Sequence, residues 1–126
     1  MDQEQAIKLL SERLDTYDDP QVVFVDCISW FAEDFSRFKK PIVNEILRRI
    51  RNPPILPQKH IKQPILPLYY LVDAISKNCD HGYSQYFGEK LPQVFEQSLY
   101  LNDKHLNDKL FGLVDYWKSE NIFSES

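Results

Sequence analysis

Glycine and cysteine are scarce in this sequence of 126 residues, which contains three glycines and two cysteines. It has no Gly-rich loop of the kind that cradles a phosphate, no nucleophile elbow and no paired-carboxylate motif, so we expect no enzyme activity. Cys27 and Cys79 lack the spacing of metal ligands, and the histidines His60, His81 and His105 have no partner at such a spacing. We therefore expect no metal site and no cofactor, two free buried thiols, and histidines at the surface or in loops.

Long apolar runs are also absent, as are a signal peptide and a lipidation motif, which predicts a soluble intracellular protein without a membrane partner. The formal net charge of −4 argues against a general nucleic-acid-binding surface. Residues 37–62 nevertheless hold eight basic residues and one acid, Glu45. Arg48, Arg49 and Arg51 in this segment are candidates for weak contact with RNA or phosphate, and a solvated helix face is the alternative that we favour.

Helical spacing of apolar residues dominates, and strict alternation is nearly absent, so we predict an all-α single domain over residues 1–126 without a sheet. A Pro-rich linker, either ordered or loose, is predicted at about residues 52–63. In the first half of the chain we predict a helix carrying Ala6, Ile7, Leu10 and Leu14, a second from about Pro20 to Phe35 with the apolar stripe Phe24, Cys27, Ile28, Phe31 and Phe35, and a third that starts near Pro41 with this proline in its first turn. In the second half we predict a helix over residues 66–78, and one or two over residues 83–99 with a boundary at Pro92. The last predicted helix is capped by Asn102 or Asp103 and ends near Phe123.

The helix over residues 66–78 contains the most informative pattern in the chain. Tyr70, Asp73 and Lys77 follow one another at i, i+3 and i+7 and therefore share one face, beside the apolar stripe that includes Leu71 and Ile75. A phenol, a carboxylate and an ammonium group in one row can receive a peptide but offer little unaided chemistry.

This helix resembles the signature helix of the CTD-interacting domain (CID) family, which binds the heptad-repeat tail of RNA polymerase II. Leu66-Pro67, Tyr70-Leu71, Asp73 and Lys77-Asn78 carry the resemblance. The segments around Phe31-Ala32-Glu33-Asp34-Phe35, Tyr83, Leu91-Pro92 and Trp117 resemble the mRNA cleavage and termination factor branch of that family.

The resemblance implies a right-handed superhelix of about seven to eight helices, of the VHS/ENTH-like type, in a nuclear protein that works with transcription and mRNA 3′-end processing factors. It also implies a peptide groove between the second, fourth and seventh helices, with residues of the last helix forming its other wall. The residues that it assigns to peptide binding are Tyr70, Asp73, Lys77, Asn78, Asp26, Lys109 and Leu113.

Several groove positions depart from the family pattern. Gly112 stands where some members carry an arginine that holds a phosphoserine, and Asp26 stands in place of an asparagine. The resemblance therefore supports the scaffold more strongly than a phosphate site. Two functions stay open: a module that binds the polymerase tail, and a related scaffold that has lost this binding and serves another protein or, weakly, RNA.

Overall fold

The computed structural model describes residues 1–19, 21–79, 81–101 and 104–123. These residues form six α-helices, one 3-10 helix and no β-strand, with a single isolated antiparallel bridge between Ile55 and Lys62. The elements are α1 (Gln3–Leu14), α2 (Val22–Asp34), η1 (Ser36–Phe38), α3 (Lys39–Arg51), α4 (Ile65–Asn78), α5 (Tyr83–Leu101) and α6 (Lys104–Ser119). The predicted all-α fold class is confirmed, whereas the number of α-helices in the described residues is six rather than seven to eight.

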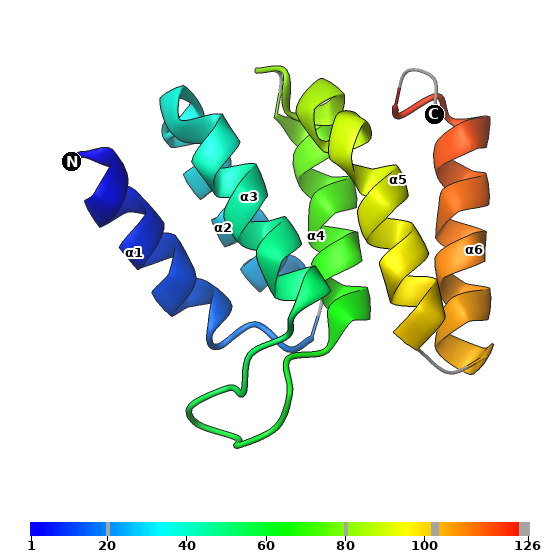
Figure 1. Ribbon diagram of the computed structural model, residues 1–126. Coiled ribbons are helices and arrows are strands. Elements are labelled where there is room, and N and C mark those ends of the chain that lie inside the picture. The colour runs from blue at the N-terminus through cyan, green and yellow to red at the C-terminus, as the bar shows by residue number, and fades with distance from the viewer. Residues whose placement is uncertain (20, 80, 102–103, 124–126) are drawn as a thin grey trace.

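The helices form two layers that run side by side across the molecule (Figure 1). Helices α1, α3 and α5 make one layer, and α2, α4 and α6 make the other. The helix α4 lies at the centre, where it packs against α2, α3 and α5. None of the helices in the described ranges is long and apolar enough to cross a membrane.

Local signals explain where several helices begin and end. Asp2 caps α1 in a capping box with Gln5. Pro41 lies in the first turn of α3, as predicted. At the other end of the chain, α6 stops at Ser119 rather than near Phe123. Asn121 adopts a left-handed conformation there, and the amide of Ile122 donates to the carbonyl of Trp117 at 3.0 Å, which is the geometry of a Schellman motif. The predicted caps Asn102 and Asp103, and the predicted start at Pro20, lie outside the described residues.

The predicted helix boundary at Pro92 is wrong, because α5 continues through this proline. A proline inside a helix costs about 3 kcal/mol, since it removes one hydrogen bond and crowds the preceding turn. The buried side chains of Tyr83, Phe87, Leu91 and Val94 lie on both sides of Pro92 and bind the whole helix to the core. Tertiary packing therefore outweighs the local signal.

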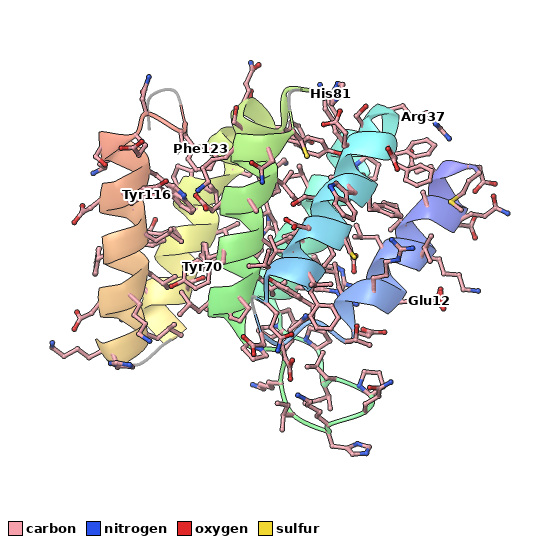
Figure 2. The ribbon with its side chains drawn as sticks, turned by 180° about the vertical axis from the view of Figure 1, so that it is seen from behind. Glu12, Arg37, Tyr70, His81, Tyr116 and Phe123 are labelled. Carbon is pink, nitrogen blue, oxygen red and sulfur yellow. The ribbon has the colours of Figure 1, made fainter. Side chains whose placement is uncertain are left out.

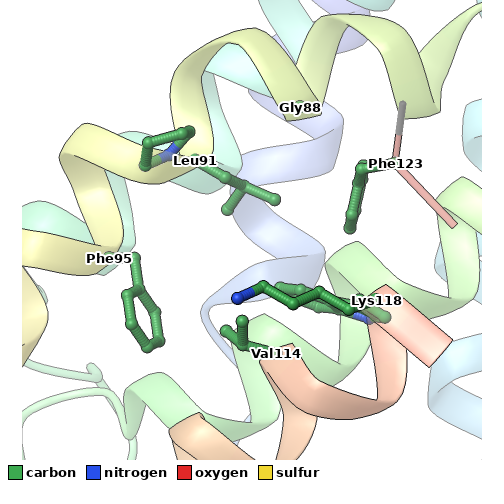
Figure 3. A pocket seen from close by; sticks show the side chains of 8 residues that line it. Gly88, Leu91, Phe95, Val114, Lys118 and Phe123 are labelled. Carbon is green, nitrogen blue, oxygen red and sulfur yellow. The ribbon is translucent and has the colours of Figure 1, made fainter. Parts of the chain in front are cut away.

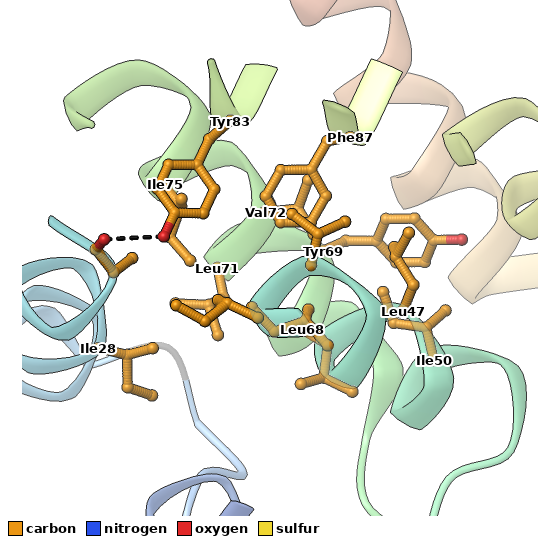
Figure 4. Close-up of a cluster of buried hydrophobic side chains, with 14 of the residues drawn as sticks. Ile28, Leu47, Ile50, Leu68, Tyr69, Leu71, Val72, Ile75, Tyr83 and Phe87 are labelled. Atoms are coloured by element: carbon orange, nitrogen blue, oxygen red, sulfur yellow. Dashed lines mark hydrogen bonds between the residues drawn. The ribbon is translucent and has the colours of Figure 1, made fainter. Parts of the chain in front are cut away.

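The core surrounds α4, whose side chains Leu68, Leu71, Val72 and Ile75 are fully buried (Figure 4). Buried tyrosines extend this core, and their hydroxyl groups have partners. The Tyr83 hydroxyl donates to the carbonyl of Ala32 at 2.8 Å, and the Tyr69 hydroxyl lies 2.8 Å from that of Ser98. Burial raises the pKa of Tyr69 to about 12, even though the hydrogen bond with Ser98 acts in the opposite direction, so this phenol stays protonated.

The buried face of α2 agrees only in part with the predicted apolar stripe of Phe24, Cys27, Ile28, Phe31 and Phe35. Ile28 and Phe31 are buried as predicted and Ala32 joins them, whereas Phe24 and Cys27 are exposed. The prediction of a buried thiol is therefore wrong for Cys27 and confirmed for Cys79. Burial, with a smaller contribution from Glu33, raises the pKa of Cys79 to about 11, so its thiol stays protonated and donates to the carbonyl of Ser29.

The linker between α3 and α4 is ordered, and Gln63 is the reason. This side chain is 2% exposed, and its amide nitrogen donates to the carbonyls of Leu14 and Tyr17 at 2.8 Å each. Its amide oxygen accepts from Arg49 at 2.8 Å. The linker is therefore attached to the end of α1 through a buried polar network.

Arg49 is the centre of that network, which corrects its assignment to a solvated or RNA-contacting face. The side chain is 2% exposed, and its guanidinium also pairs with Asp15 at 2.8 Å and Glu45 at 3.0 Å. Arg48 is exposed but forms a two-pronged interaction with the same Glu45, at 3.0 and 2.8 Å. Of the three predicted arginines, only Arg51 is both exposed and without a carboxylate partner among the described residues.

Candidate functional site

A hollow of about 410 Å³ lies between α2 and α4, on the face shown in Figure 2. Val22, Val25 and Asp26 of α2 line one side, and Tyr70, Asp73 and Ala74 of α4 line the other. The structure therefore brings together three of the predicted peptide-binding residues, Asp26, Tyr70 and Asp73. Val22, which is exposed, and Val25, which is half-buried, were not predicted, because nothing in a single sequence distinguishes such apolar side chains from core residues.

Asp73 is held in place by two partners. Its Oδ1 accepts a hydrogen bond from the indole Nε1 of Trp117 at 2.8 Å, and its Oδ2 pairs with the Lys77 ammonium at 2.9 Å. The carboxylate is 15% exposed, so it is neither fully solvated nor sealed. Each carboxylate oxygen has two lone pairs, which leaves Asp73 able to accept further hydrogen bonds from a ligand in the hollow.

Lys77 connects α4 to α6 and neutralises Asp73. Its ammonium donates to the Tyr116 hydroxyl at 3.3 Å and lies 5.1 Å from the centre of the Tyr116 ring. The hydrogen bond with Asp73 raises the pKa of Lys77, and partial burial opposes this effect only in part. The pair Asp73–Lys77 therefore presents hydrogen-bonding groups with little net charge.

The helix α6 lies beside α4 on the Lys77 side, although none of its residues lines the hollow. Lys109, Leu113 and Tyr116 follow at i, i+4 and i+7 and share one face, and the contact between Tyr116 and Lys77 shows that this face is turned to α4 (Figure 2). Lys109 is exposed and Leu113 is half-buried, so both predicted residues are available at the surface. Asn78 is exposed at the last position of α4 and does not line the hollow.

Trp117 is the functional residue that sequence reasoning placed only in the core. The side chain is 6% exposed, and its indole nitrogen ends at Asp73. Buried tryptophans usually find a partner for this nitrogen, so the apolar stripe that contains Trp117 carried a signal for a polar neighbour. Nothing in the sequence indicated that this polar neighbour is Asp73, which lies 44 residues earlier in the chain.

A second cavity, of about 280 Å³, lies on the other side of Trp117, between α5 and α6 (Figure 3). Its lining is apolar apart from the Lys118 side chain. Phe123 closes one end by packing edge-on against Trp117, with 4.9 Å between the centres of the two rings. None of the predicted site residues lines this cavity. Leu110 and Trp117 are the buried residues of α6, and Leu106, Leu113 and Val114 are partly buried against the core.

The described residues contain no group of three or more His, Cys, Asp or Glu side chains that could hold a metal ion. His60, His81 and His105 are exposed, as predicted, and His81 pairs with Glu33. The lining of the hollow itself offers hydrogen-bonding groups, on Asp26, Tyr70 and Asp73, beside apolar side chains.

Comparison with known proteins agrees with the family resemblance of the helix over residues 66–78. The structure is similar to the crystal structure of the RPR of Pcf11, with a TM-score of 0.82 and 22% sequence identity over 95% of this chain and 90% of that one. No curated protein matches the sequence significantly. The family model for the CID domain matches residues 8–126, and the chain therefore belongs to the CID domain family, a family of binding modules.

Proposed function

We propose that this chain binds the heptad-repeat C-terminal tail of RNA polymerase II in the hollow between α2 and α4, with α6 as the outer wall. The observation that carries this proposal is the meeting of Asp26, Tyr70 and Asp73 in one hollow. These residues come from the second and fourth helices, two of the three between which the resemblance to the family implies a peptide groove. Such a module acts in the nucleus, where it couples transcription to mRNA 3′-end processing or termination.

The lining suits a peptide that carries an aromatic side chain close to polar backbone groups. Val22, Val25 and Ala74 supply apolar contact, while Asp73 and Tyr70 supply hydrogen-bonding groups at the edge. Asp73 has its orientation set by Trp117 and Lys77 before any peptide arrives, so little ordering of the side chain is needed on binding.

An anisotropy titration with a labelled, unmodified two-repeat heptad peptide tests the proposal. Asp73→Ala should weaken binding by about 1–3 kcal/mol, the cost of leaving hydrogen-bond partners unmatched. The matched control is Asp108→Ala, which removes another aspartate that pairs with a lysine four positions away, here Lys104 at 3.2 Å on the surface of α6. We expect this control to bind as the wild type does.

Equal affinity of Asp73→Ala and the wild type, with an unchanged circular dichroism spectrum, would contradict the role of Asp73. A wild-type chain that binds no heptad peptide would contradict the proposal as a whole. It would favour the alternative of a CID scaffold that serves another protein partner.

A further inference from the structure

The outward face of α2 has an apolar stripe that no other part of the described chain covers. Val23, Cys27 and Trp30 follow one another at i, i+4 and i+7 and therefore share one face of the helix. All three are exposed, Val23 at 68% and Trp30 at 65%. The opposite face of α2 meets the core through Ile28 and Phe31. We call Val23, Cys27 and Trp30 the α2 stripe.

Trp30 is the most informative member of the α2 stripe, because folding usually buries most of the surface of a tryptophan. The other tryptophan of the chain, Trp117, is 6% exposed. An exposed tryptophan beside further apolar side chains is typical of interfaces, where a few such residues supply most of the binding free energy. The stripe from Val23 to Trp30 is about 10 Å long at the helical rise per residue, which matches about two turns of a partner helix.

Negative charge borders the α2 stripe. The helix α2 contains three acidic residues, Asp26, Glu33 and Asp34, and no basic residue. They lie three or four positions from Trp30 along the helix and are therefore its neighbours on the helix surface. Glu33 and Asp34 also occupy the last turn, where the helix dipole disfavours negative charge. Of the three, Glu33 alone has an ion-pair partner among the described residues, His81, which is charged only when protonated.

These charges decide between the partners that an apolar face could take. A two-fold pairing of two copies of this chain through α2 would set acids against acids, because this helix has no basic residue to meet them. The anionic surface of a membrane would repel the same acids. A basic amphipathic helix fits both features, since its apolar face covers the stripe while its lysine or arginine side chains pair with the carboxylates.

We propose that the α2 stripe is a docking site for a basic amphipathic helix of a protein partner. No residue of the stripe lines the hollow that holds Tyr70 and Asp73, where α2 contributes Val22, Val25 and Asp26. The docked helix and a heptad peptide therefore use neighbouring faces of α2, with Asp26 between them. The docking site does not depend on the proposed peptide function.

The test uses the fluorescence of Trp30 and a tryptophan-free model peptide. This peptide has about 18 residues, or about five helical turns, with leucine at helical spacing on one face and lysine on the other. Because a docked helix removes water from the exposed indole, titration with this peptide should shift the emission of the wild type to shorter wavelength. Trp30→Phe retains Trp117 and should show no shift. A peptide of the same composition with its leucines dispersed around the helix should not bind, nor should one with glutamate in place of lysine.

Anisotropy with the fluorescein-labelled leucine–lysine peptide compares two variants that lose exposed apolar side chains. Val23→Gln/Trp30→Gln should weaken binding about tenfold or more, because a central tryptophan supplies much of the binding free energy of an interface. The matched control Ile55→Gln/Ile61→Gln removes two exposed apolar side chains from the linker and should weaken binding less than about twofold. Circular dichroism verifies that each variant is folded.

A second pair of variants examines the charges. Glu33→Gln/Asp34→Asn should weaken binding about fivefold at low salt and less at high salt, because salt screens the attraction between the two helices. The matched control Glu89→Gln/Glu96→Gln changes the net charge equally, at exposed residues of α5, and should weaken binding less than about twofold. Val23→Gln/Trp30→Gln should bind the unmodified heptad peptide as the wild type does.

Equal losses in the stripe variant and the linker control would overturn the α2 stripe as a site. Equal losses in the two charge-neutralising variants would reduce the effect to net charge and overturn the preference for a basic partner. If Val23→Gln/Trp30→Gln also loses the heptad peptide while it stays folded, the stripe belongs to the peptide groove instead. Self-association of the wild type in sedimentation velocity that this variant abolishes would assign the stripe to a second copy of the chain. An emission shift with phosphatidylcholine vesicles but not with the model peptide would assign it to a membrane.

Discussion

At the residue scale, Arg49 shows how one side chain can join three segments that are distant in sequence. Its guanidinium contacts Ser11 and Asp15 at the end of α1, Glu45 on its own helix, and Gln63 in the linker before α4. A buried guanidinium loses its hydration, and only this complete set of partners offsets the loss. Arg49 therefore stabilises the structure and is not free to contact a ligand.

Replacing Arg49 with Leu should lower the free energy of unfolding by about 3 kcal/mol or more, because Glu45 and Asp15 are left without their shared partner. Arg51→Leu removes an exposed arginine two positions later and should change it by no more than about 0.5 kcal/mol. Urea denaturation followed by circular dichroism measures both values. Similar midpoints for the two variants would show that the buried network contributes little.

At the scale of single elements, charged side chains of α3 form ion pairs with one another along the helix. Glu45 accepts from Arg48 and Arg49, three and four positions later, and its side chain is 10% exposed. Burial alone would raise the pKa of this carboxyl, but hydrogen bonds from the two arginines outweigh burial and lower it below its ordinary value of 4.5. The charged form of Glu45 is therefore the one that the folded state favours.

This shift makes stability depend on pH in a defined direction. A carboxyl whose pKa is lower in the folded state stabilises that state fully above its ordinary pKa, and the contribution disappears as pH falls through the folded value. The free energy of unfolding should therefore decrease below about pH 4.5.

Glu45→Gln should be less stable than the wild type at pH 7 by about 1–3 kcal/mol and should lose less stability on acidification. Denaturation of the wild type and of Glu45→Gln at several pH values between 7 and 3 gives the pH dependence of the free energy of unfolding for each protein. Parallel curves for the wild type and Glu45→Gln would contradict the assignment of this pH dependence to Glu45.

Among the α-helices, α6 has the fewest buried side chains relative to its length, since Leu110 and Trp117 alone are buried among its 16 residues. The hydrogen bond from Trp117 to Asp73 and the fold-back of Phe123 onto Trp117 hold its C-terminal half. Buried Leu110, the edge-on packing of Phe111 against Phe95 and the hydrogen bond from Asn107 to the carbonyl of Leu99 hold the rest of this proposed outer wall. A ligand that touches both α4 and α6 would add the contacts that this wall lacks.

At the scale of the whole molecule, the charges around the hollow bear on phosphorylation. Asp26 and Asp73 both line it, and the charge of Lys77 is already matched by Asp73. An exposed lysine such as Lys109 contributes about 1 kcal/mol or less in solvent. We therefore expect at most a roughly tenfold preference for any singly phosphorylated heptad peptide over the unmodified one.

Gly112 offers a way to introduce such a preference. A Cβ added at this exposed position on α6 would meet no atom within 4 Å, so the backbone there leaves room for a side chain to extend into solvent. Gly112→Arg should raise affinity for a phosphoserine peptide severalfold through a charge-assisted contact. Gly112→Ala is the control, because it gives the same gain in helix propensity without charge.

Anisotropy titrations with unmodified and phosphorylated peptides compare the three proteins. A hundredfold preference in the wild type would reveal a phosphate site that the hollow does not show. If Gly112→Arg and Gly112→Ala have equal affinity for the phosphoserine peptide, the open position on α6 does not face the bound phosphate.

The sequence by itself determined the fold class, the helix over residues 66–78 and family membership. These depend on the spacing of neighbours in the chain, and a helix converts spacing directly into a shared face, as it does for Tyr70, Asp73 and Lys77. Periodicity does not show which other helix meets that face. The sequence therefore contained the row of side chains but not the Trp117 indole that holds Asp73.

Only the tertiary structure decided which charges are free. Arg48, Arg49 and Arg51 look alike in a basic run, yet one is buried because Asp15 and Gln63, far away in the chain, lie beside it. The same holds for the apolar residues of α2, where Cys27 is exposed and Ile28 is buried. Burial and ion pairing depend on contacts between distant segments, and those contacts exist only once the helices have packed into two layers.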